Sequence, residues 1–245
     1  MKCILLAAGY GTRLSPVTNG EVPKPLLQVA GRPMIEHILF RVEELEHVDT
    51  IYVVTNAKYF PQFQQWHAKY QGPKPIVLIN DETTSNETRL GPVGDIHLVV
   101  RQELINEDIL VIAGDNLFGF SLIDMHRFFH TIGATVVGLY DIQDKEKIRK
   151  RLGNAIVNEQ FQIVEFLEKP EDPKSTLAAT CCYMIRKTDL QQLERCIAMH
   201  QGAEAGLFIR WLTQNTKAYG FVFAEHWFDV GTPEEYQKAN THYRK

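Results

Sequence analysis

The chain has 245 residues, of which 44% are hydrophobic, and it carries a formal net charge of −4 at pH 7. This length and composition allow one large α/β domain with a full hydrophobic core. The negative charge argues against nucleic acid or a membrane surface as a general partner, and no apolar stretch is long enough to span a membrane.

Strand and helix patterns alternate along the first 140 residues. Apolar, β-branched runs predict buried strands, and amphipathic periodicity predicts helices. The strands are expected at 2–8, 50–55, 75–80, 109–113 and 134–140, and the helices at 33–45, 59–69, 93–104 and 122–131. This alternation indicates βαβ units, so we predict a Rossmann-like α/β fold with a mainly parallel, twisted sheet flanked by helices. Ligands bind such sheets beyond the carboxyl ends of the strands.

The pattern changes after residue 141. Segments 153–158 and 160–167 are predicted to form an antiparallel hairpin. A polar loop, a strand, two helices and another strand follow at 168–175, 178–186, 188–199, 205–213 and 219–224. Thr232 and Pro233 then begin a capped helix. We expect the two parts, 1–140 and 141–245, to share one sheet in a single domain over 1–245.

The cysteines do not indicate a metal site or a disulfide framework. Cys3, Cys181, Cys182 and Cys196 lack the spacing of metal ligands. The N-terminal apolar run is short and leads directly into a Gly-rich loop, which is not the pattern of a signal peptide. We therefore expect reduced thiols and a cytoplasmic location.

The loop after the first strand is the most informative segment. It reads GYGTR from Gly9 to Arg13, and Lys24 follows between two prolines. Glycines let backbone N–H groups approach a phosphate, and an Arg and a Lys supply the charge that a polyphosphate needs. The P-loop string is absent, and Leu14 stands where the dinucleotide fingerprint has its third glycine. The loop therefore predicts a site for a nucleoside triphosphate.

Two aspartates follow predicted strands later in the chain. Asp115 comes after the buried run ILVIAG, and Asp229 lies in HWFDVGTPEEY, before the capped helix. Carboxylates at the mouth of a parallel sheet are well placed to bind Mg²⁺. Taken alone, either residue also fits a turn or a helix cap.

Two neighbouring motifs carry a family resemblance. LLAAGYGTRLSPVT, from Leu5, and PKPLLQVAGRPMI, from Pro23, closely resemble the signature of the sugar-1-phosphate nucleotidyltransferases. The resemblance implies transfer of a nucleotidyl group from an NTP to a sugar 1-phosphate, with release of pyrophosphate and with Mg²⁺ as cofactor. It implies a nucleotide-binding part at 1–140 and a sugar-binding part at 141–245. The family's most frequent chemistry points to glucose 1-phosphate with UTP or dTTP.

The resemblance also implies roles for individual residues. The catalytic residues would be Arg13, on the β- and γ-phosphates, and Lys24, between the α-phosphate and the incoming phosphate. The nucleotide-binding residues would be Leu6, Ala7, Ala8, Gly9, Gly11, Thr12, Arg13, Gly91 and Asp115. The sugar-phosphate-binding residues would be Gly153, Glu168, Lys169 and Thr180. The magnesium ion would be held by Asp115 and Asp229.

The segment expected to contact the base departs from the family pattern. It reads RLGPVGD from Arg89 to Asp95, where family members usually read LGTAGA. The departure leaves the base open and keeps a mannose-1-phosphate guanylyltransferase as an alternative. A phosphocholine cytidylyltransferase shares the opening motif, and a non-catalytic nucleotide-sugar-binding regulator would share the fold.

The last motif lies close to the end of the chain, whereas longer family members continue with C-terminal helices or a β-helix. We therefore expect a short form of the family, as a monomer or homodimer. Its partners would be the NTP and the sugar 1-phosphate, not nucleic acid or a membrane.

Overall fold

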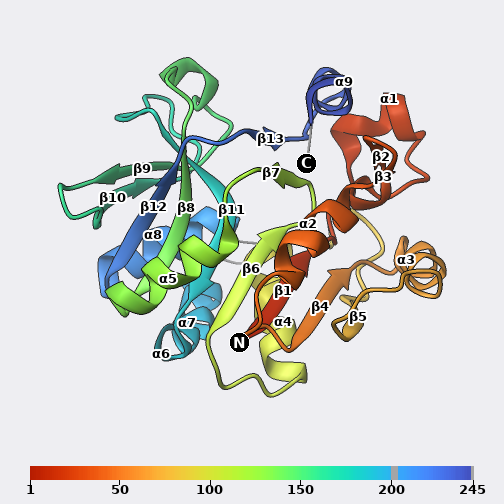
Figure 1. Cartoon of the computed structure of the whole chain (residues 1–245), viewed down its shortest axis with the longest axis horizontal. Coiled ribbons are helices and arrows are strands. Elements are labelled where there is room, and N and C mark those ends of the chain that lie inside the picture. The colour runs from red at the N-terminus through yellow and green to blue at the C-terminus, as the bar shows by residue number, and fades with distance from the viewer. Residues whose placement is uncertain (200–203, 244–245) are drawn as a thin grey trace.

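The computed structural model describes residues 1–199 and 204–243. A mixed nine-stranded sheet lies at its centre, with the two halves of the chain side by side across it (Figure 1). The strands from the first half are β1 (Lys2–Leu6), β4 (Thr50–Thr55), β5 (Ile76–Asn80), β6 (Ile109–Ala113) and β8 (Thr135–Asp141). The strands from the second half are β9 (Asn154–Val157), β10 (Ile163–Leu167), β11 (Leu177–Ile185) and β12 (Ala218–Phe223).

Strand direction in the sheet changes where the two halves meet. The strands β6, β1, β4 and β5 pair in parallel, in that spatial order. Strand β11 pairs antiparallel with β6, β8 and β9, and β9 forms the predicted hairpin with β10. Strand β12 pairs with β8 in parallel. The predicted α/β fold with an antiparallel hairpin is therefore confirmed, and β11 joins the parallel and antiparallel parts into one sheet.

Helices cover both faces of the sheet. One face carries α4 (Gly91–Gln102), α7 (Gln192–Met199) and α8 (Ala205–Asn215), and the other carries α2 (Met34–Glu43), α3 (Phe60–His67) and α5 (Leu122–Ile132). Ile4 packs on the first side and Leu5 on the second, because successive side chains of a strand point to opposite faces. Both faces of β1 are thus buried, which explains its continuous apolar run. None of the described helices is long and apolar enough to cross a membrane.

Several short elements were not predicted. Within the long loop after β1 they are η1 (Thr12–Leu14), α1 (Ser15–Thr18), η2 (Lys24–Leu26), β2 (Gln28–Val29) and β3 (Arg32–Pro33), with η3 (Lys145–Lys147) later. Pro33 ends β3 and lies just before α2, whereas the sequence pattern placed it in the helix. The predicted helix 188–199 is divided into α6 (Lys187–Leu190) and α7. Elements of two to four residues are too short to show a period.

A second, two-stranded sheet joins the two halves of the chain. Strand β7 (Asn116–Phe118) follows β6 and pairs antiparallel with β13 (Trp227–Asp229), so that Asn116 lies opposite Asp229. The backbone N–H of Val230 also donates to the carbonyl of Asp115 at 3.3 Å. This pairing brings the two predicted metal ligands, which are far apart in the sequence, beside each other. The capped helix α9 (Pro233–His242) follows as predicted, with the Thr232 side chain accepting from Glu235 N–H.

We expect Leu110→Ala to lower the free energy of unfolding by about 2–5 kcal/mol, because Leu110 is fully buried in β6 and its truncation leaves a cavity. The matched control is Leu104→Ala, at a position that is 86% exposed. The control should change the free energy of unfolding by less than about 0.5 kcal/mol. Urea unfolding followed by circular dichroism measures both, and equal losses would contradict the central position of β6.

Candidate active site

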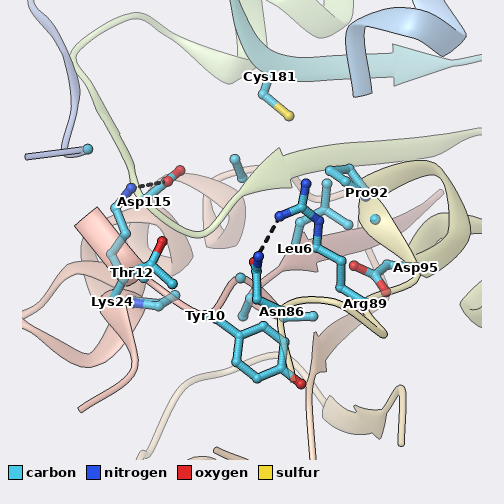
Figure 2. Close-up of a pocket in the computed structure, with 18 of the residues that line it drawn as sticks. Leu6, Tyr10, Thr12, Lys24, Asn86, Arg89, Pro92, Asp95, Asp115 and Cys181 are labelled. Atoms are coloured by element: carbon cyan, nitrogen blue, oxygen red, sulfur yellow. Dashed lines mark hydrogen bonds and ion pairs between the residues drawn. The ribbon is translucent and has the colours of Figure 1, made fainter. Parts of the chain in front are cut away.

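A cleft lies at the edge of the sheet where the parallel strands end. Leu6 and Ala113 lie opposite each other in the parallel register of β1 and β6, so the loops after both strands leave the sheet at one level. The larger cavity in the cleft has a volume of about 330 Å³, and Figure 2 shows side chains that line it. Its lining includes all the residues predicted to bind the nucleotide, together with Lys24: Leu6, Ala7, Ala8, Gly9, Gly11, Thr12, Arg13, Gly91 and Asp115.

A second cavity, of about 180 Å³, adjoins the first on the side of the second half of the chain. Asp115 and Cys181 line both cavities, and Lys169 lines the first. The lining of the second includes the other predicted sugar-phosphate residues and the second aspartate: Gly153, Glu168, Thr180 and Asp229. The structure thus brings every residue predicted for the site to one cleft, and the two cavities meet at Asp115.

Lys24 and two carboxylates form the charged centre of the cleft. The Lys24 ammonium forms an ion pair with the Asp115 carboxylate, which Figure 2 shows at one end of the larger cavity. Asp229 lies close by, because β13 is paired with β7 there. Burial and the negative charge of Asp115 raise the pKa of Asp229, while Lys24 acts in the opposite direction. A cation bound between these two carboxylates would offset their mutual repulsion, so the pair is a favourable position for one.

These two aspartates are the residues that fit a magnesium ion. Mg²⁺ is usually bound by one or two carboxylates, with substrate phosphates and water at its other positions. Among the described residues, no group of three or more His, Cys, Asp and Glu side chains is arranged to hold a metal. Asp115 and Asp229 therefore fit a cation that a phosphate substrate helps to hold, and not one enclosed by protein ligands.

Arg13 lies near the same centre and is exposed. Its guanidinium nitrogen is 3.5 Å from where a Cβ on Gly231 would lie, and its charge lowers the pKa of Asp229. Arg13 takes part in no ion pair within the part of the chain that the structure describes, whereas Arg151 pairs with Glu235. The Arg13 guanidinium is therefore available to an anion that enters the cleft.

Glu168 and Lys169 lie at the end of β10, next to the start of α8. A Cβ on Gly206 would lie 1.7 Å from Glu168 Oε2, so only glycine leaves room for this carboxyl group. Burial raises the pKa of Glu168 to about 7; Lys169 opposes this shift and Glu204 adds to it. The Lys169 ammonium lies 3.1 Å from Glu204 Oε1. The Glu168 carboxyl group and the Lys169 ammonium thus each have a charged neighbour, with which an entering ligand would have to compete.

Gly153 and Thr180 lie in the wall of the sugar-side cavity. A Cβ on Gly153 would approach the Phe166 ring to 2.7 Å, so a larger residue would displace that ring. The Thr180 hydroxyl donates to the carbonyl of Gly138 at 3.0 Å, and the Thr180 carbonyl accepts from the Asn116 side chain. Because its hydroxyl is engaged within the sheet, contact of Thr180 with a sugar stays a prediction.

Two residues of the cleft have an uncommon backbone conformation. Lys169 has a φ of 46° and Cys181 a φ of 52°, in the left-handed region that residues with a Cβ seldom adopt. Cys181 lies within the register shift of β11 against β8. Residues held in such conformations are concentrated at functional sites.

The end of the larger cavity near α4 contains polar residues that the motifs did not identify. Asp95, on α4, is buried and lines the cavity. At the rim, Arg89 donates a hydrogen bond to Asn86 Oδ1 at 2.8 Å. Gly91 begins α4 with a φ of 77°, a conformation in which glycine is favoured. A lone aspartate within an amphipathic helix has no sequence signal for a site, because what surrounds it depends on the fold.

The chain matches the nucleotidyl transferase family over residues 2–245. It is 27% identical, over 98% of its length, to the bifunctional protein GlmU of Methanocaldococcus jannaschii, and 30% identical, over 97%, to the mannose-1-phosphate guanylyltransferase of Mycobacterium tuberculosis. The chain spans 53% and 63% of the length of these two relatives. It is also 26% identical to the UTP–glucose-1-phosphate uridylyltransferase AglF of Haloferax volcanii, over 98% of this chain and 95% of AglF.

Solved structures share the fold. One assigned as a glucose-1-phosphate thymidylyltransferase from Bacillus anthracis has a TM-score of 0.85 at 24% identity, over 100% of this chain and 98% of that one. A UDP-glucose pyrophosphorylase with bound UDP-glucose has a TM-score of 0.82 at 19% identity, over 98% and 97%. At these identities the likeness shows the fold alone, whereas the family match extends over the whole chain. The resemblance of the motifs to the sugar-1-phosphate nucleotidyltransferases is thereby confirmed, and the chain belongs to the nucleotidyl transferase family.

Proposed function

We propose that the protein transfers a nucleotidyl group from a nucleoside triphosphate to a sugar 1-phosphate and releases pyrophosphate. The observation that carries the proposal is that two cavities meet at Asp115, beside Lys24 and Asp229. An NTP in the larger cavity and a sugar 1-phosphate in the smaller one would bring the acceptor phosphate to the α-phosphate. The proposal includes a cytoplasmic location and a monomer or homodimer.

The transfer requires positioning and charge neutralisation more than covalent participation of the protein. An oxygen of the sugar phosphate attacks the α-phosphorus while the bond to the pyrophosphate oxygen breaks. Lys24 holds the α-phosphate and the incoming phosphate together. Arg13 holds the β- and γ-phosphates and stabilises the departing pyrophosphate. Lys169 binds the acceptor phosphate, and Glu168 accepts hydrogen bonds from the sugar hydroxyls.

Asp115 and Asp229 would hold Mg²⁺, which when bound neutralises charge on phosphate oxygens. Lys24 is paired with Asp115 in the free protein. An entering α-phosphate therefore competes with Asp115 for the Lys24 ammonium, and it leaves the Asp115 carboxylate with a free oxygen for the cation. The same lysine thus keeps the carboxylates together before substrate binds and binds the phosphate afterwards.

Glucose 1-phosphate is the acceptor that we propose first. The relative that this chain covers most completely among those compared is a UTP–glucose-1-phosphate uridylyltransferase. Mannose 1-phosphate is the second candidate, because a mannose-1-phosphate guanylyltransferase is the relative with 30% identity. The expectation of UTP or dTTP concerns the other end of the cleft, where the base would bind.

Lys24→Ala should reduce kcat by about 10²–10³-fold, or about 2.7–4 kcal/mol, as removal of one preorganised donor does. Pyrophosphate release with an NTP, a sugar 1-phosphate and Mg²⁺ measures this loss. The control is Lys69→Ala, an exposed lysine outside both cavities, which should keep wild-type turnover. A Lys24→Ala protein as active as the control would contradict the assignment.

EDTA should abolish pyrophosphate release, and added Mg²⁺ should restore it. Asp229→Asn should raise the Mg²⁺ concentration needed for half-maximal activity by roughly tenfold or more, because one of two ligands loses its charge. Mg²⁺ titrations of both proteins give the comparison. Asp124→Asn, at an exposed ion pair on α5, should leave the titration unchanged. An unaltered Mg²⁺ requirement in Asp229→Asn would remove that residue from the proposed metal site.

The KM for the sugar 1-phosphate should fall as the pH rises from 6 to 8. The raised pKa of Glu168, about 7, means that its carboxyl group is protonated at the lower pH and ionised at the higher one. Only the ionised form accepts hydrogen bonds from sugar hydroxyls at both oxygens. The phosphate of the substrate also titrates, so the test is the difference between the wild-type and Glu168→Gln pH profiles. Parallel profiles would show that Glu168 does not set this dependence.

A further inference from the structure

Two buried carboxyl groups meet near the α4 end of the larger cavity, away from the residues proposed to hold the phosphates, and one of them, Asp95, lines the cavity. Asp95, on α4, is 5% exposed, and Asp81, directly after β5, is 7% exposed. Burial and the neighbouring Asp81 raise the pKa of Asp95 to about 8, and the two carboxyl groups hydrogen-bond each other. Near neutral pH the pair therefore holds one proton and one negative charge.

The proton of the pair belongs on Asp95. The backbone N–H and the hydroxyl of Thr83 both donate to Asp81 Oδ1 at 2.8 Å, which favours the ionised form of Asp81. Asp81 Oδ2 and Asp95 Oδ1 receive no hydrogen bond from any other described residue. The Asp95 proton is therefore assigned to the hydrogen bond with Asp81. Toward a ligand in the cavity, Asp95 can therefore act as a hydrogen-bond acceptor but not as a donor.

Asp95 is part of the cavity wall, and its surroundings match a flat ring better than a phosphate. Figure 2 shows its carboxyl group among Leu6, Pro92 and Arg89. Leu6 and Pro92 are apolar, and Asp95 itself is buried, so a hydrogen bond to it is stronger than one in open water. A negatively charged carboxyl pair would repel phosphate. Leu6 and Gly91 are residues proposed to contact the base, so Asp95 lies where a base would turn its polar edge.

The bases differ in what they offer to an acceptor. Guanine carries N1–H and the N2 amino group side by side, and cytosine and adenine each carry an exocyclic amino group. Uracil and thymine have no amino group, and their one N–H lies between two carbonyl oxygens that a negative carboxyl pair repels. Arg89 at the rim donates to Asn86 and lies 3.7 Å from Glu204 Oε1, and its further N–H groups can donate to a base carbonyl, such as O6 of guanine. An acceptor that receives both N1–H and the N2 amino group, with a donor for O6 beside it, is the complement of guanine, whereas uracil offers that acceptor a single N–H.

We propose that Asp95, supported by Asp81, selects a nucleotide whose base carries an exocyclic amino group, with guanine the best match, and rejects UTP and dTTP. This inference rests on the proposed function only for the placement of a nucleotide in the larger cavity. It replaces the UTP or dTTP expected from the family's most frequent chemistry, because the buried polar side chain at the proposed base end of the cavity is an acid, Asp95.

Calorimetric titration of the wild-type protein with GTP, CTP, ATP, UTP and dTTP, with Mg²⁺ and without any sugar phosphate, tests the selection directly. We expect GTP to bind at least tenfold more tightly than UTP and dTTP. Tightest binding of CTP or ATP would support selection for the amino group and exclude guanine as the preferred base. Tightest binding of UTP or dTTP, or equal binding of all five, would overturn the proposal.

Asp95→Asn tests the residue itself. An amide presents a donor beside an acceptor, which suits the N–H and carbonyl of uracil. We expect the affinity for GTP to fall by about 10–100-fold and that for UTP to rise, so that the ratio of the two affinities changes markedly. The matched control is Asp189→Asn, an equally buried aspartate that accepts from Thr135 and lies outside both cavities. The control should keep the wild-type ratio.

A thermal unfolding curve shows whether Asp95→Asn is folded before its affinities are compared. An unchanged ratio of GTP to UTP affinity in the folded variant would make Asp95 a structural residue and overturn the proposal. Selective binding of GTP, with no pyrophosphate released from it in the presence of any sugar 1-phosphate, would leave the base assignment intact and reject the proposed function. The base selectivity and the proposed nucleotidyl transfer can therefore be rejected independently of each other.

Discussion

The parallel register of β1 against β4 and β6 is the constraint on which the site depends. Leu6 lies opposite Val54 on one side and Ala113 on the other. The chain stays anchored one residue beyond each pairing, with Ala7 N–H donating to Val54 O and Gly114 N–H donating to Leu6 O, both at 2.8 Å. The Gly-rich loop after β1 and the Asp115 turn after β6 therefore begin at one level of the sheet, and a cleft between them requires no additional element.

Three acids with raised pKa values divide the cleft by chemistry. Burial raises the pKa values of Asp229, Glu168 and Asp95, yet each has a different neighbour. Asp229 lies beside a second carboxylate and a lysine, which suits a cation. Glu168 lies beside Lys169, which suits a phosphorylated sugar, and Asp95 shares a proton with another aspartate, which suits a donor on a base. Perturbed acids of this kind are concentrated where ligands bind, and here they trace the path of both proposed substrates.

Much of the fold could be predicted from the sequence because its long elements have strong periods. The continuous apolar run of β1 indicates a strand buried on both faces, and the amphipathic pattern of α5 indicates a helix with one packed face. The pairing of β7 with β13 could not be predicted, since three-residue strands have no period and their partners are far apart in the chain. The antiparallel pairing of β11 with β6 could not be predicted either. A continuous apolar run indicates a buried strand, but it does not indicate whether the neighbouring strand is parallel or antiparallel.

By itself the sequence determined the chemistry that is encoded in contiguous motifs. The GYGTR loop, Lys24 between its prolines and the neighbouring Glu168 and Lys169 each hold their polar groups on one short segment, so local order is enough to recognise them. Only the tertiary structure decided which separate groups meet. Lys24 pairs with Asp115, and Asp81 raises the pKa of Asp95, because separate elements of the chain are brought within hydrogen-bonding distance. The interaction between two charges, and the pKa shifts that it causes, depend on their distance in space, which the order of residues alone does not give.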